Sequence, residues 1–116
     1  MIDHLDYIAD LGATAIWSTP LLLDNENGAS YHGYSCSDYY LIDPRYGSNE
    51  LFKEYVDQCH ERGLKVIMDI VPNHSSTSHW WYGDQPFEDW THQWDKYTQS
   101  NWTFSTNMDF NASKSD

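Results

Sequence analysis

Three polar residues interrupt or follow the apolar segment 64–71, and their types suit a binding site. Asp69 lies inside the segment, and Asn73 and His74 come directly after it. A carboxylate buried in an apolar strand costs several kcal/mol unless it is paired or hydrogen-bonded. Asp69 therefore either orients neighbouring groups in the floor of a polar site or is an ordinary buried aspartate that backbone amides satisfy. Asn73 and His74 could reach a ligand from the end of the strand, although a single loop histidine is more often simply solvated.

Aromatic side chains are unusually frequent, at 16% of the residues, and concentrate in two segments without regular periodicity, 31–48 and 79–90. The C–H face of a pyranose ring packs against an aromatic ring, while Asp, Asn and His side chains bind its hydroxyl groups. The two segments are therefore suited to carbohydrate binding. The alternative is that the rings pack long loops onto the scaffold. We expect this of most of them, with one or two rings facing a ligand.

Several other chemistries lack their characteristic residue spacing. The histidines show no HxH or HExxH pattern, so they predict no metal site. The sequence has no glycine-rich phosphate loop and no GxSxG turn that would carry a nucleophilic serine. Cys36 and Cys59 have no CxxC spacing and are expected to be ordinary thiols. Phosphoryl transfer and acyl transfer therefore have no support.

Apolar periodicity predicts two helices and two strands that would position these side chains. The expected elements are a helix over 2–11 that ends at Gly12, a strand over 13–18, a long connection over 21–47, a helix from Ser48 to Gly63 and a strand over 64–71. The second strand is apolar on both parities, which is typical of a parallel strand covered on both faces. Because ligands bind where parallel strands end, residues 18–20 and 72–74 are the expected edge of a site. Segment 74–116 follows neither period and is expected to be irregular.

The length of 116 residues allows one domain at most, and the charge excludes anionic partners. Six Lys and Arg against 18 Asp and Glu give a net charge of −12, which would repel nucleic acid or an anionic membrane surface. No window approaches the roughly 18 to 20 apolar residues of a membrane helix. Two parallel strands would leave their outer edges unpaired. Either other chains complete the sheet, or the chain is a slice of a larger fold such as an eight-stranded barrel.

Three ordered motifs resemble the α-amylase superfamily of glycoside hydrolases. The string DIVPNH at 69–74 is similar to the DxVxNH signature at the third barrel strand of that family, and the preceding HERGLKVIMD matches the same stretch. LDYIADLGATAIWSTP, from Leu5, looks like the first helix and second strand of the family, and YHGYSCSDYYLIDPRYGS, from Tyr31, resembles its substrate loop. HWWYGDQPFEDW, from His79, is similar to the insertion after the third strand in neopullulanase and cyclomaltodextrinase types.

The resemblance implies roles for individual residues. Tyr34 would stack on the sugar at the cleavage subsite, and His74 would hydrogen-bond the primary hydroxyl of that sugar. Asp69 would be a structural carboxylate beside the site, and Asn73 matches a position that helps to bind a structural calcium ion in many α-amylases. The catalytic nucleophile and general acid of the family lie on its fourth and fifth strands. Both are therefore expected beyond Asp116, and no catalytic residue is expected within this chain.

These implications define the expectations for the whole chain. The expected fold class is α/β, a partial (β/α)8 TIM barrel of about two βα units over 1–73, and a domain B-like insertion begins in 74–116. The expected function is part of a retaining α-glycoside hydrolase that acts on α-glucans or cyclomaltodextrins and forms one wall of the cleavage subsite. The alternatives are a non-catalytic carbohydrate-binding or assembly module and an unrelated parallel α/β protein. Alone, the chain should be inactive and should self-associate, unless 74–116 folds back over the sheet.

Overall fold

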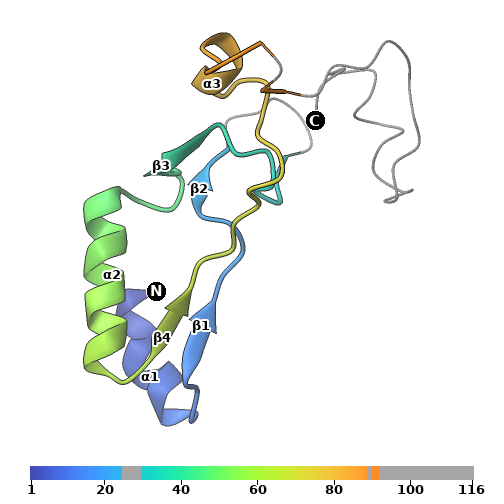
Figure 1. The fold of residues 1–116 in the computed structure, drawn as a ribbon. Coiled ribbons are helices and arrows are strands. Elements are labelled where there is room, and N and C mark those ends of the chain that lie inside the picture. Colours follow the sequence, from blue (N-terminus) through green and yellow to red (C-terminus); the bar gives the residue numbers. More distant parts are fainter. Residues whose placement is uncertain (25–29, 89, 92–116) are drawn as a thin grey trace.

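The chain folds into an α/β arrangement in which helices and short strands alternate (Figure 1). The structure, a computed structural model, describes residues 1–24, 30–88, 90 and 91. Its elements are η1 (Ile2–His4), α1 (Leu5–Asp10), β1 (Ala15–Trp17), β2 (Leu22–Leu23), β3 (Asp38–Ile42), α2 (Asn49–Glu61), β4 (Lys65–Ile67) and α3 (Trp80–Gly83). The predicted helix over 2–11 is present as η1 followed by α1. Gly12, with a φ of 83°, reverses the chain after it.

Helix α2 confirms the prediction of a helix between Ser48 and Gly63. Ser48 is its N-cap, and the Oγ atom of Ser48 accepts a hydrogen bond from the backbone N–H of Leu51 at 3.2 Å. Tyr55 and Cys59 are buried on the inner face of the helix. Both ends agree with the prediction because the serine cap and the glycine stop act within the local chain.

Strands β1 and β4 are parallel, and α2 lies in the connection between them. In their ladder Ile16 lies opposite Val66. The expected strands over 13–18 and 64–71 are longer than the observed ones, and the prediction of their ends is wrong. Strand β1 offers ladder partners for three residues of β4, so the apolar run after Ile67 continues without a partner strand in the described part of the chain.

A second, antiparallel sheet lies inside segment 21–47, where the sequence predicts only a connection. Strands β2 and β3 pair with Leu22 opposite Ile42 and Leu23 opposite Asp38, and the register shifts between these two pairs. The tyrosines and aliphatic residues of β3 favour a strand, but the surrounding Gly, Pro and Asn residues conceal that signal. The hairpin carries the tyrosine-rich loop toward the end of β4.

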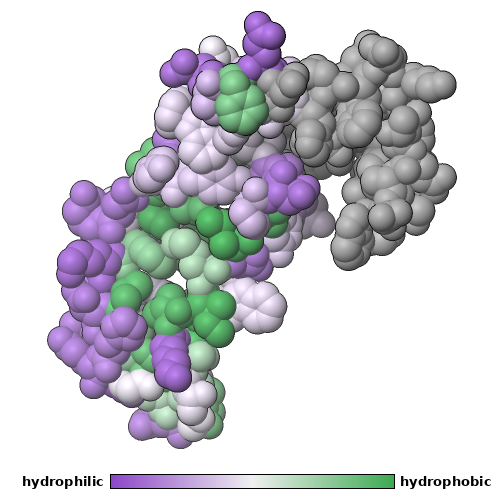
Figure 2. Space-filling model, viewed as in Figure 1, coloured by the Kyte–Doolittle hydropathy of each residue, from purple (hydrophilic) through white to green (hydrophobic). Residues whose placement is uncertain are grey.

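The main hydrophobic core lies between the helices and one face of the β1–β4 sheet. Its buried members are Leu5, Tyr55, Cys59 and Leu64. Ile16 and Val66 pack against this core from the sheet. Trp17 and Ile67 point to the other face, because side chains alternate along a strand, and they are 70% and 48% exposed. Figure 2 shows hydrophobic residues gathered beside the hydrophilic outer side of α2. The second face of this sheet is therefore largely open in the described residues.

In the described residues after β4, 68–88, 90 and 91, the chain follows an irregular path that includes the single turn of α3. This agrees with the absence of a regular period after residue 74. Residues 89 and 92–116 lie outside the described residues, and with them lies the greater part of the expected insertion. None of the described helices has the length and apolar character that crossing a membrane requires.

Candidate functional site

Tyr34, Asp69 and His74 meet beyond the end of β4, although Tyr34 is 35 and 40 residues away from the other two in sequence. The hydroxyl of Tyr34 donates a hydrogen bond to Asp69 Oδ2 at 3.1 Å. His74 Nε2 lies 3.1 Å from the backbone carbonyl oxygen of Tyr34. Since a carbonyl oxygen can only accept, this contact is a hydrogen bond when Nε2 carries a proton, and in the neutral imidazole that tautomer leaves Nδ1 as the acceptor nitrogen. Asn73, the fourth predicted site residue, is exposed next to His74.

Asp69 is half-buried, and its hydrogen-bond partner is the phenol of Tyr34. The same contact raises the pKa of Tyr34, mainly because ionising the phenol would break the hydrogen bond to Asp69; burial and, to a smaller extent, the negative charge of Asp69 act in the same direction. The phenol therefore keeps its proton at neutral pH and remains a donor to the carboxylate. This interaction fixes the far end of a ring that is itself 40% exposed.

A shallow hollow adjoins these residues. Its lining comes from Pro20 after β1, Gly33 and Tyr34 before β3, Tyr39 on β3 and residues 69–71 after β4. The enclosed space is only about 10 Å³, room for about one water molecule. Pockets that enclose small molecules usually hold roughly 300 to 1,000 Å³. The hollow is therefore far too small to enclose a small molecule by itself.

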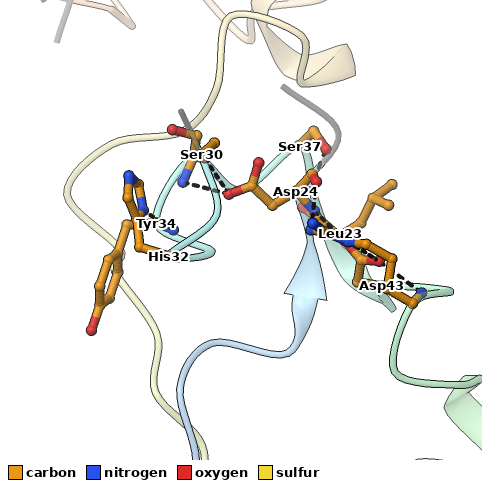
Figure 3. Close-up of polar contacts among 9 residues, drawn as sticks. Leu23, Asp24, Ser30, His32, Tyr34, Ser37 and Asp43 are labelled. Atoms are coloured by element: carbon orange, nitrogen blue, oxygen red, sulfur yellow. Dashed lines mark hydrogen bonds and ion pairs between the residues drawn. The ribbon is translucent and has the colours of Figure 1, made fainter. Parts of the chain in front are cut away.

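Aromatic rings extend from Tyr34 along the preceding loop. The His32 ring stacks on Tyr34 with 5.5 Å between centroids, and the Tyr31 ring meets His32 edge-on at 5.4 Å. His32 Nδ1 also accepts a hydrogen bond from the backbone N–H of Tyr34 at 3.0 Å (Figure 3). Gly33 has a φ of 82°, and a Cβ atom there would lie 3.0 Å from Pro20 Cβ, so glycine is required. Sequence reasoning includes Tyr31 and His32 in the aromatic segment 31–48 but assigns an individual role only to Tyr34.

A buried polar network holds the loop between β2 and β3 (Figure 3). The guanidinium of Arg45 donates two hydrogen bonds to the Asp43 carboxylate, from Nε at 2.9 Å and from Nη2 at 2.7 Å. Asp43 also accepts from the backbone N–H of Asp24. The Asp24 carboxylate in turn accepts from the Ser30 hydroxyl and the Ser35 backbone N–H. Both carboxylates are buried, so this network fixes the base of the loop that presents the aromatic rings.

The Arg45 contact predicts acid-sensitive stability. Arg45 lowers the pKa of Asp43 from 3.8 to about 2. A carboxyl whose pKa is lower in the folded state than in the unfolded state stabilises the fold above the unfolded value, and this contribution disappears as the pH falls from about 4 to about 2. We expect Asp43→Asn to lower the free energy of unfolding at pH 7 by about 1 to 2 kcal/mol. The effect is no larger because Arg45 is 54% exposed and solvent screens its interaction with Asp43.

Urea unfolding followed by circular dichroism at several pH values measures this effect. The matched control is Asp57→Asn, which removes an exposed ion pair with Lys53 on α2 and should cost less than about 0.5 kcal/mol. The Asp43→Asn protein should also lose less stability than the unmodified chain between pH 4 and pH 2. If Asp43→Asn and the unmodified chain lost the same free energy of unfolding between pH 4 and pH 2, the role of Asp43 would be contradicted.

The site includes no ready-made metal cluster. Within residues 1–24, 30–88, 90 and 91, no three His, Cys, Asp or Glu side chains are grouped so that they could hold a metal ion. Asn73, the position that the resemblance associates with calcium, is exposed and has no such group beside it.

Comparison with protein families and curated proteins relates the whole chain to carbohydrate-active enzymes. The family model described as the catalytic domain of α-amylase matches residues 1–114. A cyclomaltodextrinase of Geobacillus thermopakistaniensis is 44% identical over 89 residues, which are 77% of this chain and 14% of that protein. Trehalose-6-phosphate hydrolase of Bacillus subtilis is 37% identical over 115 residues, covering 94% of this chain and 20% of the enzyme.

Solved structures show the same relationship. The α-amylase of Anoxybacillus matches with a TM-score of 0.72 and 40% identity, over 87% of this chain and 22% of that one. The α-amylase of Geobacillus thermoleovorans, solved in complex with acarbose, matches with a TM-score of 0.71 and 40% identity over the same shares. The chain thus spans between 14% and 22% of the length of these four proteins.

Proposed function

The chain belongs to the α-amylase catalytic-domain family, and on this premise we propose that it is part of a retaining α-glycoside hydrolase. In this proposal Tyr34 and His74 form one wall of the sugar subsite at the cleavage point. The relatives named cyclomaltodextrinase, trehalose-6-phosphate hydrolase and oligo-1,6-glucosidase are glycoside hydrolases. The proposed substrates are accordingly α-glucans or cyclomaltodextrins.

The contact of Tyr34 with Asp69 and His74 is the observation that carries this proposal. Asp69 fixes the hydroxyl end of the Tyr34 side chain, so the ring loses little freedom when a ligand packs on it. An aromatic face held in this way suits the C–H side of a pyranose. With Nε2–H directed to the Tyr34 carbonyl, His74 Nδ1 can accept a hydrogen bond from a sugar hydroxyl. Asp69 and, next to His74, Asn73 are assigned to the support of the site.

We further propose that residues 1–73 supply about two βα units of a (β/α)8 barrel and that residues 74–116 begin an insertion. The parallel pair of β1 and β4 with α2 in the connection is the repeating unit of such a barrel. The exposed side chains of Trp17 and Ile67 support the same inference, because neighbouring barrel elements would cover that face of the sheet.

The proposed hydrolysis needs groups from outside this chain. Retaining glycosidases use two carboxyl groups about 5 to 5.5 Å apart, one as the nucleophile and one as the general acid. In the described residues, Asp69 is the carboxylate that contacts Tyr34. Its Oδ2 atom already accepts a hydrogen bond from the Tyr34 hydroxyl. We therefore assign sugar binding to this chain and expect the nucleophile and general acid beyond Asp116.

A non-catalytic carbohydrate-binding module is the second candidate, and the exposed succession of the Tyr31, His32 and Tyr34 rings favours it. Both candidates bind glucan, so binding does not separate them. A hydrolase requires a reading frame that continues past Asp116 into strands with an aspartate nucleophile motif and then a glutamate motif. Sequencing that reading frame decides between the two.

Acarbose binding by the chain tests the proposed subsite. Tyr34→Ala removes the stacking face and is expected to weaken binding about fivefold or more, since such a contact is worth on the order of 1 kcal/mol. Tyr7→Ala is the matched control, because Tyr7 is an exposed tyrosine on α1, and its affinity should not change. Calorimetric titration measures all three proteins. Equal affinities would contradict the role of Tyr34, and an unmodified chain that binds no acarbose would contradict the subsite itself.

A further inference from the structure

Tyr39 of β3 links the turn after β4 to the aromatic residues of α3. Its hydroxyl lies 2.9 Å from the carbonyl oxygen of Val71 and 2.6 Å from that of His74. A phenol has one proton, so the two carbonyl oxygens share it, with the shorter contact to His74. These two carbonyls lie at the two ends of segment 71–74, which bends at Asn73 and which we call the 71–74 turn. The hydroxyl therefore holds both ends of the turn that carries the His74 imidazole.

The ring of Tyr39 is itself held in place. It stacks on Trp81 with 5.3 Å between centroids and lies 5.4 Å from the ring of His79. His79 is 2% exposed and caps α3, where its Nδ1 accepts a hydrogen bond from the backbone N–H of Trp81 at 3.1 Å. Burial lowers the pKa of His79, so the acceptor nitrogen stays unprotonated at neutral pH. Tyr39 thus has a fixed ring and presents its hydroxyl at a defined place.

We propose that Tyr39 is a positioning residue for His74: its hydroxyl holds the 71–74 turn so that the imidazole reaches the Tyr34 carbonyl and faces the sugar subsite. This inference rests on the proposed function of the site. Through the packing of Trp81 and His79 on Tyr39, the support extends to α3. In this proposal Trp81 and His79 act on the site indirectly, through the Tyr39 ring, and do not contact the sugar themselves.

A second contact attaches the segment after β4 to the loop before β3, so the effect of the Tyr39 hydroxyl can be tested without detaching that segment. The backbone N–H of Ser76 donates a hydrogen bond to the carbonyl oxygen of Cys36 at 2.8 Å, without participation of Tyr39. Tyr39→Phe also retains the ring and its packing on Trp81. We therefore expect this variant to keep the fold and to release only the 71–74 turn.

Long-range proton–nitrogen NMR spectra of the chain report which nitrogen of His74 carries the proton, and the His74→Ala variant assigns the signals. We expect the Nε2–H tautomer of His74 to dominate in the unmodified chain. In the Tyr39→Phe variant the ratio of the two His74 tautomers should shift toward that of a free imidazole. Tyr40→Phe is the matched control, because Tyr40 is the next residue of β3 and is 73% exposed. An unchanged His74 tautomer in Tyr39→Phe would overturn the proposal.

A double-mutant cycle of acarbose affinity separates positioning from general loosening. Tyr39→Phe is expected to weaken binding about three- to tenfold, the range for the loss of one hydrogen bond. In the His74→Ala background it should have no further effect. The same loss in both backgrounds would overturn the proposal. If the unmodified chain binds no acarbose, the proposed function fails, and the NMR result alone decides on Tyr39.

Discussion

The chain is expected to release no reducing sugar from starch or cyclomaltodextrin, even where it binds acarbose. Retaining hydrolysis places a carboxylate at the anomeric carbon and a carboxylic acid at the glycosidic oxygen, about 5 to 5.5 Å apart. Asp69 accepts a hydrogen bond from Tyr34 and is thereby held beside the ring. With the family's two catalytic carboxyl groups expected beyond Asp116, neither nucleophilic attack nor protonation of the leaving group has a residue to perform it.

A reducing-sugar assay at high protein concentration, against a mock purification from the same host, measures this absence of turnover. The expected effect is large, since enzymes accelerate their reactions by about a millionfold or more. Asp69→Asn is the informative variant, because it removes the carboxylate that contacts the site. Any turnover by the unmodified chain would contradict the assignment, and its loss in Asp69→Asn would show that the turnover depends on this carboxylate.

Features that depend on the local chain could be predicted from the sequence, whereas features that depend on a partner could not. The Ser48 cap and the following apolar period act within a few residues, and α2 agrees with them. The end of β4 depends on how far β1 extends beside it, and no pattern within 64–71 encodes that length. The β2–β3 hairpin was concealed for the same reason, because two-residue β2 becomes a strand only by pairing with β3.

The candidate site shows the same division. Asp69 could be located because a carboxylate interrupts an apolar run, and His74 from the rule that ligands bind at the ends of parallel strands, while the role of Tyr34 came from the resemblance alone. Their contacts with one another join segments 35 and 40 residues apart, which no spacing predicts. The proposed role of Tyr39 could not be predicted, because it depends on two carbonyl oxygens after β4 and on a ring of α3. Nothing in the side chain itself distinguishes it from the other tyrosines of the loop.

Self-association is the expected state of the isolated chain. Trp17, Ile67 and Ile70 expose 70%, 48% and 50% of their surface along the β1–β4 sheet and the run that continues β4. Burying such a surface is favourable by about 25 cal/mol per Å², and open strand edges add unpaired backbone groups. The net charge of −12 opposes indiscriminate aggregation. The balance favours a dimer in which each chain covers the open sheet of the other.

The location of the open face makes this expectation specific. In Figure 1, α3 lies at the opposite end of the described structure from β1 and β4, so it does not cover the sheet. Ile67→Asp places a charge at the centre of the expected contact and should convert the dimer to a monomer in sedimentation at micromolar concentration. Leu11→Asp, at a residue 67% exposed after α1, is the matched control and should remain dimeric. A compact 13.6 kDa monomer with cooperative unfolding would contradict this expectation. In that case the chain's own residues must cover the sheet. The exposed face would then no longer be an argument for neighbouring barrel strands.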